Sequence, residues 1–218
     1  MDIKTKTKDL IESIPSEVTL VAVSKTKSIE EITQSYEAGQ RVFGENKIQE
    51  MASKYEELPK DIQWHMIGNV QTNKIKYMAP FVSLVHGVDR EKVLKELNKQ
   101  AVKNERTINC LLQVHIAEED TKFGFDKNEL SELADHLKDF TNVNVVGLMG
   151  MATNTKDQAQ IEKEFEGLNF LFESLKEKLE SDFNTLSMGM SGDYKLAIEK
   201  GSNMIRVGSS IFGARNYA

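Results

Sequence analysis

The sequence predicts an α/β fold of the (β/α)8 barrel class with one extra helix at the N-terminus. Short apolar runs alternate with amphipathic segments, the alternation repeats eight times, and 218 residues suffice for a compact barrel. A doubly wound open sheet would also alternate, but it is the second choice because no dinucleotide-binding fingerprint accompanies the repeat. Residues 1–218 are expected to form one domain, since no stretch resembles a linker.

The first strand-helix unit sets the pattern that the chain repeats. Apolar side chains spaced among charges predict an N-terminal helix over residues 2–14, outside the main repeat. The apolar run at 19–25 predicts a strand buried on both faces, because a strand in a parallel sheet has no solvated side. Ser28, followed three residues later by Glu31, is a capping box that predicts a helix up to Gly39.

Seven further units follow in order. The predicted strands cover residues 41–44, 62–67, 82–86, 108–116, 143–149, 185–188 and 204–207. The predicted helices cover residues 46–55, 71–78, 91–104, 128–140, 156–180 and 193–200, and a last short helix follows the eighth strand. Eight consecutive units at this chain length favour the closed barrel.

Composition excludes several classes of function. Lysine and arginine number 28 against 34 acidic residues, a net charge of −6, so no nucleic-acid partner is expected. The single cysteine, Cys110, has no partner for an internal disulfide and is predicted to be a buried thiol; with no signal-peptide pattern, a cytoplasmic protein is the simplest inference. No apolar run approaches the roughly 18 residues of a membrane span. No spacing suggests a metal site.

The first strand delivers a lysine, Lys25, at its carboxyl end. In parallel α/β folds ligands bind at the carboxyl ends of the strands, so this position suits chemistry. Lys25 could equally be the polar end of a strand that meets water, since Lys27 lies two residues on. This stretch alone does not decide between the two interpretations.

The last two units each end in small residues that could cradle a phosphate. The turns at 189–192 and 208–213 would expose backbone N–H groups near a positive helix end, although the glycines could also serve only as tight-turn residues. Arg206 is expected to point the same way as Gly208 and to need either an anionic ligand or a carboxylate from a neighbouring strand. A lysine that faces two phosphate-binding turns suits a phosphorylated cofactor that carries an aldehyde, and pyridoxal 5′-phosphate fits this description.

Six segments together closely resemble the pyridoxal phosphate homeostasis protein family. They are residues 23–25, 43–50, 64–74, 122–125, 187–193 and 206–213. The resemblance implies a barrel like the N-terminal domain of alanine racemase, with the cofactor held as a Schiff base on Lys25 and Asn46 close to it. It also implies that Arg206 faces the pyridine nitrogen. The phosphate would be held by Ser191, Gly208 and Ser209.

The resemblance also implies a carrier. Racemases of this type recruit a tyrosine from a second domain, and no such domain is expected here. No catalytic residue is therefore assigned, and the protein is expected to serve the intracellular supply of pyridoxal phosphate as a monomer, with apo-enzymes as transient recipients. Two alternatives stay open: an active racemase-like enzyme, and a barrel that binds another phosphorylated metabolite, with Lys25 acting electrostatically.

A few residues depart from the family pattern or invite a functional role. Lys47 and Gly87 stand where relatives often carry an aromatic residue and a serine, which puts the rim near them in doubt. Three of the four histidines are interpreted as structural residues; they are His65, His86 and His115. Four methionines near the ends of the sixth and seventh strands suit either the core or a cofactor wall; they are Met149, Met151, Met188 and Met190.

Overall fold

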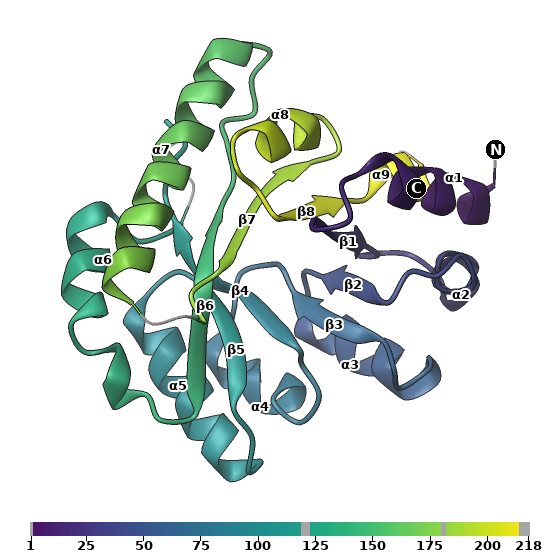
Figure 1. The fold of residues 1–218 in the computed structure, drawn as a ribbon. Coiled ribbons are helices and arrows are strands. Elements are labelled where there is room, and N and C mark those ends of the chain that lie inside the picture. Colours follow the sequence, from purple (N-terminus) through teal and green to yellow (C-terminus); the bar gives the residue numbers. More distant parts are fainter. Residues whose placement is uncertain (1, 119–122, 180–181, 214–218) are drawn as a thin grey trace.

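The computed structural model describes residues 2–118, 123–179 and 182–213 and confirms the predicted barrel. Eight parallel strands close in sequence order, and β1 pairs with both β2 and β8 (Figure 1). The strands are β1 (Thr19–Val23), β2 (Val42–Glu45), β3 (Gln63–Met66), β4 (Leu84–Val88), β5 (Ile108–Val114), β6 (Val143–Gly150), β7 (Thr185–Met190) and β8 (Met204–Val207).

Helices follow the strands as the spacing predicts. They are α1 (Ile3–Ser13), α2 (Ile29–Glu37), α3 (Ile48–Glu57), η1 (Thr72–Lys74), α4 (Ile75–Met78), α5 (Glu91–Lys103), α6 (Lys127–Ala134), η2 (Leu137–Asp139), α7 (Gln158–Lys178), α8 (Tyr194–Glu199) and α9 (Ser209–Phe212). The helix predicted over 128–140 is wrong in its second half, because His136 leaves the helical region at φ −128° and ψ 17° and only a 3-10 turn follows. Glu180, at the predicted end of α7, lies outside the described residues.

Local chemistry explains where the helices begin. The predicted capping box is present, since the Ser28 hydroxyl accepts from Glu31 N at 3.2 Å and the Glu31 carboxylate accepts from Ser28 N at 2.9 Å. A second capping box, on Asp126, begins α6. The extra helix α1 lies against α2 and α9, as Figure 1 shows, and Thr7 on α1 reaches Ser35 on α2 in a buried hydrogen bond.

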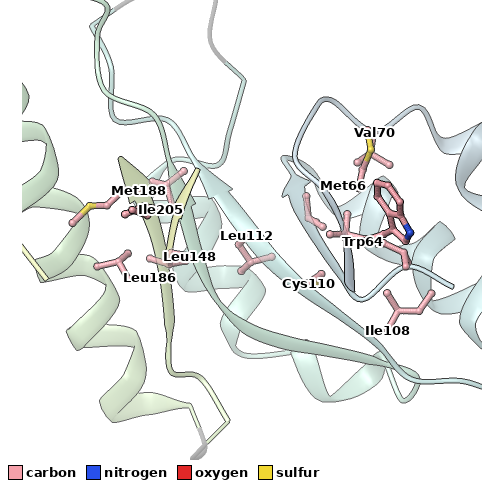
Figure 2. Packing of buried hydrophobic residues seen from close by; sticks show 14 of the residues in the cluster. Trp64, Met66, Val70, Ile108, Cys110, Leu112, Leu148, Leu186, Met188 and Ile205 are labelled. Atoms are coloured by element: carbon pink, nitrogen blue, oxygen red, sulfur yellow. The ribbon is translucent and has the colours of Figure 1, made fainter. Parts of the chain in front are cut away.

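The apolar core fills the layer between the strands and the helices. Its largest fully buried side chains include Phe43, Trp64 and Phe165, and Figure 2 shows part of it along neighbouring strands. Cys110 is a buried thiol, as predicted. A smaller cluster includes Val21 on β1. Within the described ranges, no helix is both long and apolar enough to span a membrane.

Candidate functional site at the carboxyl end of the barrel

All six residues that the sequence predicts to bind the cofactor line one cavity of about 590 Å³. They are Lys25, Asn46, Ser191, Arg206, Gly208 and Ser209. The loops after β1, β2, β3, β7 and β8 all contribute to its lining. The cavity therefore lies where parallel barrels bind their ligands.

Closure of the barrel brings the first and last strands together at this cavity. In the β1–β8 register Val21 pairs with Arg206 and Ala22 with Val207. Gly208 packs so closely on Val23 that a Cβ at position 208 would lie 3.2 Å from Val23 Cβ. The two ends of the sequence that carry Lys25 and the small-residue turn thus share one rim.

The loops after β7 and β8 lie against each other. Ser191 Oγ accepts a hydrogen bond from Gly208 N at 3.1 Å. The Asp193 carboxylate accepts from Met190 N at 2.5 Å and folds the β7 loop into a tight turn. Gly208 precedes α9, whose first N–H groups have no acceptor within the helix. Hydroxyl and main-chain donors therefore gather at one edge of the cavity, as an anion requires.

Arg206 is 4% exposed and holds its charge among neutral oxygens. Its guanidinium donates to Ser187 O at 2.9 Å, Ser187 Oγ at 2.6 Å and Gly150 O at 2.9 Å. Burial lowers the pKa of Arg206 to about 10, while Asp193 acts to raise it. The sequence predicted that the partner of Arg206 is either an anionic ligand or a carboxylate from a neighbouring strand. In the described structure carbonyl and hydroxyl oxygens fix its head at the cavity, and Arg206 stays charged at neutral pH.

A buried hydrogen-bond chain continues from Arg206 through the barrel interior. Because the guanidinium can only donate to Ser187 Oγ, the Ser187 hydroxyl is free to donate to His86 Nδ1, 3.2 Å away. His86 Nε2 lies 3.0 Å from His65 Nδ1, so a single proton shared between these two ring nitrogens continues the chain. Both histidines are buried and neither lines the cavity, in agreement with the structural interpretation. His115, in contrast, is exposed.

The turn that carries Lys25 is tightly built. Lys27 N donates to Ser24 O at 3.0 Å, and Thr26, third in this turn, has a φ of +65°. The Lys27 ammonium pairs with Glu31 at 3.1 Å and donates to Phe212 O at 3.2 Å, which ties this turn to α9. Both lysines line the cavity.

The structure also assigns residues whose roles the sequence left open. Met151 and Met190 line the cavity, whereas Met149 and Met188 are buried in the core. Position 87 has room only for glycine, because a Cβ there would lie 2.3 Å from the Gly68 carbonyl oxygen.

Other lining residues were assigned no role from the sequence. They include Ile67, Asn69 and Gln113. Phe123, also on the lining, is 63% exposed. Lys122, in one of the resembling segments, lies outside the described residues.

Fold and cavity define a class, a parallel barrel with a lysine and an edge of hydroxyl and main-chain N–H groups at the carboxyl ends of its strands. Residues 2–216 match the family described as the N-terminal domain of alanine racemase. A pyridoxal phosphate homeostasis protein of Pasteurella multocida is 41% identical over 207 residues, which cover 93% of this chain and 89% of the relative. The chain belongs to this family of pyridoxal phosphate homeostasis proteins within the alanine racemase N-terminal domain group.

Further relatives agree with this assignment. The Escherichia coli K12 protein of the same name is 36% identical over 208 residues, covering 94% of this chain and 88% of the relative. PipY of Synechococcus elongatus, solved with PLP bound, superposes with a TM-score of 0.90 at 32% identity, covering 97% of this chain and 100% of PipY. Alanine racemase of Bartonella henselae shares the fold, with a TM-score of 0.76 at 15% identity over 100% of this chain and 62% of the racemase.

Proposed function

We propose that this protein holds pyridoxal 5′-phosphate as a Schiff base on Lys25 and serves the supply of this cofactor without turning over a substrate. The observation that carries the proposal is that Lys25, Arg206 and the facing β7 and β8 loops line one cavity. Lys25 would supply the amine that condenses with the aldehyde, with water as the leaving group, and Ser191, Gly208 and Ser209 would hold the phosphate. The names of the relatives and the PLP-bound PipY structure support this cofactor.

The charge state of Arg206 favours binding over turnover. When bound, pyridoxal phosphate supplies an electron sink, and the sink is strong when the ring nitrogen is protonated. Arg206 donates and cannot accept, so opposite that nitrogen it leaves the nitrogen unprotonated. The three hydrogen bonds to Ser187 and Gly150 hold the guanidinium in place for this role. A neutral ring suits a carrier.

The lining of the cavity also favours a carrier over a racemase-like enzyme. Among the described lining residues, the titratable side chains are Lys25, Lys27 and Arg206. A two-base racemase needs a second acid or base on the opposite face of the cofactor. Lys27 is occupied by Glu31 and the Phe212 carbonyl.

We further propose that all 218 residues form one domain and that the protein acts in the cytoplasm as a monomer, with apo-enzymes as recipients of the cofactor. Size-exclusion chromatography tests the monomeric state.

The absorption spectrum of the purified protein tests the proposal. We expect a visible band with added pyridoxal phosphate, a Lys25 adduct after borohydride reduction, and loss of both in Lys25→Ala but not in Lys47→Ala, whose lysine does not line the cavity. An unmodified Lys25 would overturn the proposal in favour of another phosphorylated metabolite. Exchange of an amino-acid α-proton in deuterated water, faster than with free cofactor, would instead establish a racemase-like enzyme.

A further inference from the structure

A cluster of three ionisable side chains lies under the turn that carries Lys25. Lys54 on α3 has its ammonium 2.8 Å from the carboxylate of Glu45 on β2 and 2.7 Å from that of Glu50. The side chains of Lys54 and Glu45 are 7% and 0% exposed. Buried charges are costly even when paired, and apolar replacements of such pairs are often as stable or more so. Stability alone therefore does not explain the cluster.

The cluster contacts the residues on both sides of Lys25. Lys54 Nζ donates to Ser24 O at 2.8 Å, and the Ser24 hydroxyl donates to Glu45 Oε1 at 2.6 Å. Thr26 N donates to Glu50 Oε1 at 2.6 Å. The main chain immediately before and after Lys25 is thus fixed to one group of charges, and Lys25 lies between the two anchor points.

The turn needs such anchors because Thr26 is strained. A φ of +65° is rare for a β-branched residue, and a backbone held in this region is energetically costly. Such a conformation persists only where its surroundings over-determine it. The hydrogen bond from Thr26 N to Glu50, itself held by Lys54, is a contact that opposes relaxation of the turn.

The hydrogen bonds within the cluster are incomplete. Glu45 Oε2 is buried and has no hydrogen-bond partner among the described residues. Burial raises the pKa of the Glu45 carboxyl, against the opposing effects of Lys54 and Ser24. Burial also acts to raise the pKa of Glu50, but the hydrogen bonds from Lys54 and Thr26 outweigh it and lower that pKa. The cluster keeps an unsatisfied oxygen while all three of its side chains contact the Lys25 turn.

We propose that Lys54, together with Glu45 and Glu50, is a positioning group that holds the Lys25 turn in its strained form and so presents the Lys25 amine to the aldehyde of the cofactor. This inference rests on the proposed function, because it concerns the same lysine. Holding a nucleophile in its reactive direction before the ligand arrives removes an ordering cost from the reaction. The cluster does not line the cavity, so it acts through the turn alone.

Three variants separate positioning from folding. Lys54→Met removes the donor to Ser24 but leaves two carboxylates unpaired, which can prevent folding. The double variant Glu45→Gln/Lys54→Met removes one of these charges as well, and Lys54→Arg keeps the positive charge. Lys200→Met is the matched control, because Lys200 also pairs with two carboxylates, those of Glu162 and Glu166, outside the cavity.

Two measurements then test the inference. Amide hydrogen exchange without cofactor is expected to be faster at Thr26 in Glu45→Gln/Lys54→Met and unchanged in Lys200→Met. With pyridoxal phosphate added, borohydride trapping is expected to show the Lys25 adduct forming about 10- to 100-fold more slowly in the double variant, with partial recovery in Lys54→Arg. Equal rates in all variants would overturn the inference alone. No Lys25 adduct in the wild type would overturn the proposed function, and the inference with it.

Discussion

Two buried histidines make the stability of this barrel depend on pH. Burial lowers the pKa of His65 from 6.5 to about 3. Burial, and then the neighbouring His65 and Arg206, hold the pKa of His86 well below its ordinary value. The folded protein therefore keeps both rings neutral where the unfolded chain takes up protons. The stability that His65 contributes is complete above about pH 6.5 and is lost as the pH falls from there toward 3, and His86 acts in the same direction.

The size of the effect follows from proton linkage. A group that is protonated only in the unfolded state changes the free energy of unfolding by about 1.4 kcal/mol per pH unit. Over two pH units below the ordinary value of 6.5, His65 alone then removes about 3 kcal/mol. A domain has only about 5–15 kcal/mol of net stability, so the loss is measurable.

Urea unfolding at a series of pH values measures this loss. Trp64, the single tryptophan, is fully buried and reports unfolding by fluorescence. Carboxylates titrate in the same range, so His65→Asn, which can keep an acceptor near the position of Nδ1, is the reference. Below about pH 6.5 the wild type is expected to lose stability more steeply than His65→Asn, by about 1.4 kcal/mol per pH unit. Parallel pH dependences would show that His65 is not held neutral.

Three further predictions concern packing, ligand binding and helix capping. Gly147→Ala should destabilise the barrel by at least about 3 kcal/mol in the urea titration, because its Cβ would lie 1.7 Å from Thr185 O and the backbone there has a φ of +157°. Gly167→Ala in α7 is the control: a Cβ there would meet nothing within 4 Å, so this variant should be more stable by about 0.5–1 kcal/mol. Ser191→Ala should weaken equilibrium binding of pyridoxal phosphate about tenfold and leave that of pyridoxal, which lacks the phosphate, unchanged. Asp126→Ala removes the cap of α6 and should cost about 1 kcal/mol in the urea titration.

The fold could be predicted from the sequence because its signals are local. Strands buried on both faces give continuous apolar runs, and the capping box at Ser28 fixes the start of α2. Element boundaries shift by a few residues: the strand predicted at 82–86 begins at Leu84, for example. The break after Ala134 could not be foreseen, because the apolar spacing continues through it and the backbone of His136 departs from the helix without a glycine or proline.

The gathering of the site residues follows from barrel topology. Once the strands close, the first and last units become neighbours, so Lys25 and Gly208 share a rim although they lie far apart in sequence. The supporting residues were not predictable. Glu50 and Lys54, four residues apart on a helix, have the spacing of an ordinary exposed ion pair, and only the packing of α3 buries Lys54 and leaves Glu50 partly exposed. Ser187 is likewise paired with a histidine 101 residues away.

Two groups of buried charges lie next to the cavity, and their placement bears on why the barrel keeps them. Arg206 is held by carbonyl and hydroxyl oxygens with no carboxylate within ion-pair distance in the described structure, and Glu45 has an unsatisfied oxygen. A barrel optimised for stability would fill such positions with branched apolar residues. Both groups instead hold a feature of the cavity, the guanidinium head in one case and the Lys25 turn in the other. Under the proposed function, ligand binding gives the reason for charged side chains at positions where apolar ones would often be as stable.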